Sequence, residues 1–359
     1  MYRAGINDLT SLLSGGAVLS EDGILACLSK YFPDRHETLL LGRGDDAAVI
    51  RAEKPLCVSS DLFLEDSHFR RAYFTPEEIG HKALAVNVSD MAACGAKPLG
   101  FTLCLGLPRQ TETAWLEEFF RGMSALAEKS GIVLAGGDLS VCERMHISIT
   151  IWGEAERGLF LRRGNGRPGD ALFATGGIGL ARVGLYELEA RGREAVSIWP
   201  EACAAHLRPR PQTQAGITIV RLADPGRPPA LIDVSDGLAR DLPRLLQGPS
   251  PTRNIGASLR LPPESLHPEV RRFAAELGFD PVSEALLGGE DYALLGSCSP
   301  GLLPELQAAL PDLFFIGVVT ENPEIFVNGK PFNVSGFDHF HSSPVFAQNS
   351  PNRHTYRSF

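Results

Sequence analysis

The chain has 359 residues, 44% of them hydrophobic, and this length and composition are typical of a globular protein with two domains. Its 43 acidic residues outnumber its 34 basic ones and give a net charge of −9, which argues against nucleic acid or an anionic membrane as a partner. No apolar run reaches the roughly 18–20 residues of a membrane-spanning helix, and the first residues lack the pattern of a secretion signal, so we expect a soluble, cytoplasmic protein.

The spacing of the cysteines argues against two kinds of structural site. None of the seven lies in a CxxC pair, and none is clustered with histidine, so neither a zinc site nor a disulfide framework is indicated. We expect them to be small hydrophobic residues of the interior. They are Cys27, Cys57, Cys94, Cys104, Cys142, Cys203 and Cys298.

The first half of the chain predicts both helices and strands. The expected elements are an extension at 1–19, a helix at 20–31, strands within 55–69, helices at 75–95 and 113–130, a strand that ends at Asp138 and a strand at 146–155. The helix at 75–95 has the clearest signals, because Thr75 and Glu78 form a capping box with Pro76 at the first helical position. Gly95 then predicts its end.

The second half is expected to begin near residue 156, where the stretch ERGLFLRRGNGRPG is rich in glycine and arginine. Beyond it we expect a strand at 170–177, a helix at 178–190, a strand that leads into a helix at 229–237 and a loop that leads into a strand at 287–295. This pattern predicts α/β or α+β layers in each half. The expected domains are residues 20–155 and 156–340, followed by a disordered polar tail at 341–359.

Acidic residues recur in one local pattern, at the end of an apolar run and beside small residues. The places are GRGDDAA (Asp45, Asp46), VSSD (Asp61), VNVSD (Asp90), AGGD (Asp138) and IDVSDG (Asp233, Asp236). Each acid could instead cap a helix or shape a turn, because aspartate is favoured at both positions. Asp90 fits this alternative poorly, since its helix is apolar nearly all round, and a buried carboxylate needs a partner or a proton.

Converging carboxylates would repel one another unless cations lay between them. Mg²⁺ prefers oxygen ligands from carboxylates, water and phosphates, so a polyphosphate held by Mg²⁺ would satisfy both the acids and the ligand. The glycines of GRG, GGD and 176–177 allow backbone N–H groups to approach phosphates. No GxxxxGK[ST] loop is present. The residues alone therefore indicate a Mg²⁺-dependent enzyme acting on nucleotides or phosphoryl groups, without indicating which substrate.

Taken in order, a set of motifs resembles the thiamine-phosphate kinase family over about residues 20–340. The motifs are GRGDDAA, SSDLFLEDSHF, GHKALAVNVSDMAACGAKP, GGD, RRGNGRPGD, IDVSDGL, LGGEDY and GFDHF. The family belongs to the aminoimidazole ribonucleotide synthetase-like superfamily. The resemblance therefore implies an α/β (α+β) fold of two α/β domains, and a homodimer built around a β-barrel of N-terminal-domain strands.

The resemblance also implies a reaction, direct transfer of the γ-phosphoryl group of ATP to the phosphate of thiamine monophosphate. Several Mg²⁺ ions would neutralise the phosphates, and a requirement for a monovalent cation stays open. Because the acceptor is already an anion, no residue is expected to act as a catalytic base.

The resemblance carries site residues over position by position. The implied metal ligands are Asp46, Ser59, Ser60, Asp61, Asp90, Asp138, Asp233 and Asp236; the positions that contact ATP are Gly137, Asp138, Arg163 and Ser235; and those that hold thiamine phosphate are His68, Glu290 and Phe337. An arginine suits a phosphate, and an aromatic face with a carboxylate suits a flat cationic ligand. Asp45 would shape the turn beside Asp46 or act through contacts with the residues that bind the metal.

Some positions depart from the family pattern. Leu139 and Ser140 replace two threonines after GGD, two serines replace the threonines before Asp61, and the pair Asp66 and Ser67 replaces a glycine. One alternative is another ATP-dependent enzyme of the superfamily, although selenophosphate synthesis would call for a reactive cysteine or selenocysteine in the N-terminal glycine-rich loop. The other is a nucleotide-sensing paralogue without activity, for which Leu139 is the relevant feature.

Overall fold

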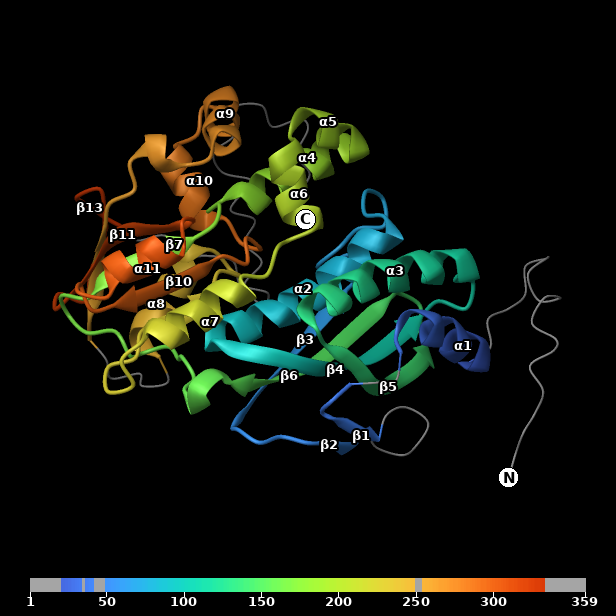
Figure 1. Cartoon of the computed structure of the whole chain (residues 1–359). Helices are drawn as coiled ribbons and strands as arrows, with labels where there is room; N and C mark the ends of the chain where they lie inside the picture. The colour runs from blue at the N-terminus through green and yellow to red at the C-terminus, as the bar shows by residue number, and fades with distance from the viewer. Residues whose placement is uncertain (1–20, 34–35, 42–48, 249–253, 333–359) are drawn as a thin grey trace.

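Two β-sheets organise the protein, which a computed structural model describes at residues 21–33, 36–41, 49–248 and 254–332. One sheet has four strands in the order β3-β6-β4-β5, and the other has seven in the order β13-β12-β9-β11-β7-β10-β8. Helices pack against both sheets (Figure 1), so the expected α/β (α+β) class is confirmed. In these residues no helix is both long and apolar enough to cross a bilayer.

The four-stranded sheet comes from the first half of the chain. Its elements are α1 (Glu21–Tyr31), β1 (Leu39–Leu41), β2 (Val49–Ile50), β3 (Leu56–Leu64), α2 (Pro76–Cys94), β4 (Ala96–Leu107), α3 (Thr113–Ser130), β5 (Val133–Val141) and β6 (His146–Ala155). Helix α2 packs on one face, against β3, β6 and β4, and α3 lies beside α2 (Figure 1). On the other face, the β1–β2 ribbon packs Leu39 and Ile50 near Trp152. The sheet runs open from β3 to β5 in the single chain.

The seven-stranded sheet comes from the second half. Its elements are β7 (Ala171–Thr175), α4 (Leu180–Arg191), α5 (Ala195–Ile198), α6 (Pro200–Leu207), α7 (Thr213–Leu222), β8 (Ala230–Asp233), α8 (Leu238–Gln247), β9 (Gly256–Leu259), α9 (Pro268–Leu277), α10 (Pro281–Leu287), β10 (Leu294–Cys298), α11 (Leu303–Ala309), β11 (Leu313–Thr320), β12 (Ile325–Val327) and β13 (Lys330–Pro331). Only β9 and β12 pair in parallel among these described strands. The domain boundaries stay a prediction, and the extension at 1–19 and the tail at 341–359 lie outside the described residues.

The signals for the helix at 75–95 are confirmed in α2. The Thr75 hydroxyl accepts a hydrogen bond from the Glu78 N–H at 3.3 Å, and the Thr75 N–H donates to the Glu78 carboxylate at 2.8 Å. The helix ends at Gly95, whose φ of +64° lies in the left-handed region that glycine favours. The expected helix at 113–130 is α3.

Two acids lie within strands rather than at strand ends. Strand β5 does not stop at Asp138, because the long strand β4 pairs with it as far as Leu107 and Val141. Likewise, β3 continues through Asp61. Asp233, in contrast, is the last residue of β8, as the sequence predicts.

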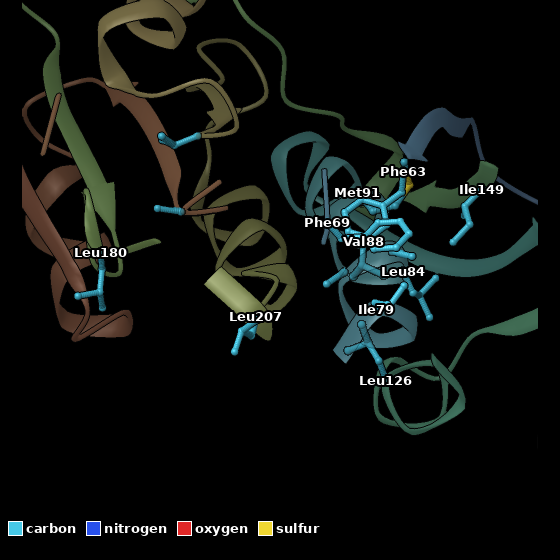
Figure 2. Packing of buried hydrophobic residues seen from close by; sticks show 14 of the residues in the cluster. Phe63, Phe69, Ile79, Leu84, Val88, Met91, Leu126, Ile149, Leu180 and Leu207 are labelled. Carbon is cyan, nitrogen blue, oxygen red and sulfur yellow. The ribbon is translucent and has the colours of Figure 1, made fainter. Parts of the chain in front are cut away.

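Helix α2 is buried on nearly every side. The labelled side chains of Figure 2 include Ile79, Leu84, Val88 and Met91 of α2 together with Phe63, Phe69, Leu126 and Ile149. Close contact with α3 requires glycine on both helices: a Cβ on Gly80 would lie 2.0 Å from the Phe119 carbonyl oxygen, and one on Gly122 would lie 1.9 Å from that of Glu77. The position of α2 is therefore fixed by backbone-to-backbone packing.

This packing predicts the effect of Gly122→Ala. Alanine is the better helix former by about 1 kcal/mol, so an exposed site would gain stability. Here the added methyl group must push α2 and α3 apart, and we expect a net loss of about 1–3 kcal/mol, measured by urea unfolding. Gly301→Ala is the control, because a Cβ there meets nothing within 4 Å. An equal or higher unfolding free energy for Gly122→Ala would contradict this account.

Candidate active site

Three of the expected acids come together from three separate segments of the chain. Asp61 lies on β3, Asp90 on α2 and Asp233 at the end of β8. Asp61 and Asp90 share a hydrogen bond between their carboxyl groups, and the charges of both act on Asp233. Two serines donate to the group: Ser59 to Asp90 at 2.5 Å, and Ser89 to Asp233 at 2.8 Å. We call Asp61, Asp90 and Asp233 the carboxylate cluster.

Burial and mutual repulsion disfavour negative charge in the carboxylate cluster. Burial, and then the neighbouring charge of Asp90, raise the pKa of Asp61 to about 7 and that of Asp233 to about 7. Burial also raises the pKa of Asp90, although the hydrogen bond from Ser59 and the positive charge of Arg163 act in the opposite direction. The cluster therefore holds oxygen ligands that a cation would stabilise in their charged form.

The local fold explains why these side chains meet. Side chains alternate along β3, so Ser59 and Asp61 point to the face on which α2 packs. Helix α2 also contacts β8. The donation from Ser89 to Asp233 therefore joins the first half of the chain to the second directly beside Asp90.

Arg163 carries a positive charge that acts on the carboxylate cluster. Its side chain is exposed, and its charge lowers the pKa of Asp90. The chain around it is anchored at both sides, by a hydrogen bond from the Leu161 N–H to the Cys94 carbonyl and by one from the Gly164 N–H to the Leu245 carbonyl. An exposed guanidinium held in this way can meet a phosphate bound at the cluster.

Two of the expected metal ligands point away from the carboxylate cluster. Ser60 faces the other side of the sheet, where its hydroxyl lies 2.8 Å from that of Thr150. Asp236 is held by arginines, with one oxygen 2.6 Å from Arg244 and 3.7 Å from Arg240. In the described arrangement, therefore, neither side chain adds to the cluster, and their roles as ligands stay predictions.

Asp138 lies on the far edge and on the opposite face of the sheet from Asp61. The register aligns Asp138 with Cys104, Ser148 and Leu62, the residue that follows Asp61 on β3. Neighbours along such a row share a face, so Asp138 and Asp61 point in opposite directions. They are also separated by three strand spacings of roughly 4.8 Å each.

Gly137 has a structural reason to be glycine. A Cβ there would lie 1.8 Å from the Leu103 carbonyl oxygen on the paired strand β4. This close approach accounts for the residue without a phosphate. Contact of Gly137 with ATP therefore stays a prediction.

The structure describes two of the three expected substrate residues. Phe337 lies outside the described residues, as does the expected metal ligand Asp46. His68 accepts a hydrogen bond from the Leu64 N–H at 3.0 Å and stacks on Phe63. Glu290 lies in the loop before β10, where its backbone N–H donates to the Ser235 carbonyl at 2.8 Å. Glu290, expected at the substrate, and Ser235, expected at ATP, therefore lie side by side.

Four polar residues of this region were not predicted from the sequence: Lys82, Ser89, Asp241 and Asp291. Lys82 is fully buried and pairs with Glu290. Asp291 accepts hydrogen bonds from the Gly179 and Ala181 N–H groups and so caps α4, and burial raises its pKa to about 7. The reasoning that identified Asp90 could have found Lys82, because a lysine in a helix apolar on all sides needs a buried partner.

The donor chemistry of the carboxylate cluster fits a hard divalent cation. Carboxylate and hydroxyl oxygens, without sulfur or imidazole, are the ligands that Mg²⁺ prefers. Within the described ranges, however, no three histidine, cysteine, aspartate or glutamate side chains surround a single point as metal ligands. Any ion here would therefore also need oxygens from phosphate, water or residues such as Asp46.

Comparisons with known proteins agree with this architecture. Residues 44–155 match the family described as AIR synthase related protein, N-terminal domain. The thiamine-monophosphate kinase of Synechococcus elongatus is 33% identical over 86% of this chain and 90% of its own length, and that of Aquifex aeolicus is 34% identical over 83% and 92%. The chain belongs to the thiamine-monophosphate kinase family.

Solved structures of this family share the fold. A thiamine-monophosphate kinase of Stenotrophomonas maltophilia aligns with a TM-score of 0.70 at 31% identity, over 87% of this chain and 96% of its own. A structure described as AaThiL complexed with AMPPCP and TMP aligns with a TM-score of 0.71 at 31% identity, over 89% and 97%. The hydrogenase maturation protein HypE, at 21% identity and a TM-score of 0.69, shares the fold alone.

The raised pKa of Asp61 predicts how pH acts on stability. A carboxyl group with a higher pKa in the folded state loses stability as pH rises from its unfolded value, near 4, through about 7. In metal-free buffer we therefore expect Asp61→Asn to raise the melting temperature at pH 8 by about 2 °C, and by less at pH 5, where Asp61 is already protonated.

Scanning calorimetry with a chelator measures this difference, and exposed Asp312→Asn is the matched control. A melting temperature lowered equally at both pH values would mean that Asp61 is not repelled in the metal-free protein.

Proposed function

We propose that the protein is a thiamine-monophosphate kinase that transfers the γ-phosphoryl group of ATP directly to the phosphate of thiamine monophosphate. The observation that carries this proposal is the carboxylate cluster, in which buried Asp233 and half-buried Asp61 and Asp90 come together where the two halves of the chain meet. Membership of the family, and a relative described with both AMPPCP and TMP bound, support the same substrates.

The chain's own residues would hold and neutralise the two phosphate groups. Asp61, Asp90 and Asp233 would be metal ligands, with Ser59 held against Asp90. These residues would hold magnesium, which would supply positive charge to neutralise the phosphates. Arg163 would add positive charge from the exposed side. Since the acceptor phosphate is itself the nucleophile, the site does not need a base, and the cluster contains no imidazole or amine that could act as one.

The test is product formation. Purified protein with ATP, Mg²⁺ and thiamine monophosphate should form thiamine diphosphate, detected by fluorescence after oxidation, and a chelator should stop the reaction. Asp90→Asn should lower kcat by about 100-fold or more while leaving the far-UV circular dichroism spectrum unchanged, because it weakens a metal ligand and keeps the shape. Asp312→Asn is the control. Absence of product from the wild type, or full activity of Asp90→Asn, would contradict the proposal.

Leu139 no longer supports the alternative of a sensor without activity. Its side chain is half-buried and packs against the hydrophobic core. A leucine in place of a threonine there exchanges one interior contact for another. The change leaves the carboxylate cluster untouched.

We also propose that the active form is a homodimer joined through the face of the four-stranded sheet that is opposite α2. On this face two apolar side chains are largely exposed: Val58 (64%) and Leu62 (60%). Such a surface is unusual for a monomer. Asp138 lies on the same face, so a second copy would cover it.

Val58→Arg tests the dimer. A charge in a buried sheet interface should prevent association, so analytical ultracentrifugation should find monomers. It should also reduce kcat, because each subunit would lose its partner. Lys54→Arg, an exposed change just before β3, is the control. A wild-type protein that is active as a monomer would refute this part of the proposal.

A further inference from the structure

Lys82 is an ammonium group with no access to solvent. It lies on α2 at 0% exposure, and its Nζ atom is 3.1 Å from Oε1 of Glu290. The same atom is 3.4 Å from Nδ1 of His206 and lies over the ring of Phe74, 5.4 Å from its centre. Within the described structure, Glu290 is the acid that pairs with it.

Glu290 uses both carboxylate oxygens within this group. Oε1 binds Lys82, and Oε2 lies 3.2 Å from Nδ1 of His206 on α6. The side chain is still 24% exposed, so part of it remains accessible to a ligand. Its backbone is also constrained, with φ at +62°, in the left-handed region that is unfavourable for a residue with a Cβ.

Lys82 and Glu290 act on each other's charge: burial lowers the pKa of Lys82, while the charge of Glu290 and its hydrogen bond act in the opposite direction. Burial alone would raise the pKa of Glu290, but the positive charge of Lys82 and the hydrogen bonds from Lys82 and His206 hold it far below its usual range. Burial lowers the pKa of His206, and the charge of Lys82 lowers it further, which favours the neutral imidazole. Its contact with Glu290 favours a proton on Nδ1, and the buried Nε2 has no hydrogen-bond partner among the described residues.

We propose that Lys82 is a positioning residue for the acceptor, which holds the carboxylate of Glu290 ionised and aimed at the cationic end of the substrate. His206 holds the second oxygen and so fixes the plane of the carboxylate. This inference rests on the proposed function, since it takes the flat, positively charged rings of thiamine monophosphate as the partner of the exposed part of Glu290. Lys82 itself does not touch the substrate.

The first test separates acceptor binding from ATP binding. In Lys82→Met, Glu290 loses its cation and its fixed direction, so KM for thiamine monophosphate should rise about tenfold or more while KM for ATP stays unchanged. Lys129→Met, an exposed change on α3, is the matched control. A purely structural role would instead lower kcat and alter both KM values together.

The pH dependence gives a second readout. Without Lys82, burial moves the pKa of Glu290 upward, so the carboxyl group becomes neutral as pH falls and acceptor KM rises. The ratio of variant to wild-type KM removes the titration of the substrate itself. This ratio should increase from pH 8 to pH 6 in Lys82→Met and stay flat in Glu290→Gln and in the double variant. The charged or titratable groups that act on Glu290 or are acted on by it are Lys82, His206, Tyr73, Asp291 and Tyr292.

The outcomes are distinct. If the wild type forms no thiamine diphosphate, the proposed function fails and this inference fails with it. If the wild type is active and Lys82→Met has the wild-type acceptor KM, or a flat ratio, only the inference is overturned. If circular dichroism shows that Lys82→Met is unfolded, His206→Leu is the deciding variant. Loss of the donor to Oε2 should raise KM for the acceptor and leave KM for ATP unchanged. An unchanged KM for the acceptor in His206→Leu would overturn the inference.

Discussion

The burial of α2 between the two halves of the chain is the constraint on which the rest of the structure depends. Three polar side chains of this apolar helix contact other segments of the chain. Lys82 binds Glu290, Ser89 binds Asp233, and Asp90 contacts Ser59 and Asp61. Lys82 and Ser89 are seven residues apart, or about 10 Å along the helix axis. One rigid element thus sets the distance between the proposed acceptor end and the proposed metal end of the site.

The two ends of the site balance the negative charge of their buried carboxylates in different ways. At Glu290 the protein supplies its own cation, and breaking such a pair typically costs about 3–5 kcal/mol. At the carboxylate cluster the described protein supplies only hydroxyl groups and the exposed Arg163, so burial and repulsion raise the pKa of Asp61 and Asp233 to about 7. The difference fits a permanent binding surface at one end and a site for exchangeable cations at the other.

Local rules predicted the fold well and the site in part. The capping box of Thr75 and the all-round apolar pattern near Asp90 are signals within one element, and both led to the observed structure. The position of Asp138 could not be predicted, because the face to which a strand residue points depends on its register with neighbouring strands. The partner of Lys82 could not be predicted for a related reason, since Glu290 lies 208 positions further along the chain.

The tight fit of α2 has a consequence for how such a chain can change its length. A substitution on this helix alters one contact, whereas inserting a single residue between Lys82 and Ser89 would turn one end by about 100° relative to the other. Lys82 and Asp90 could then no longer reach their partners at the same time. Gly80 and Gly122 prevent the helix from sliding to compensate, because their backbones already touch those of the neighbouring helix. Insertions and deletions should therefore be tolerated in loops and not within α2, because the length of this helix fixes the spacing of the site.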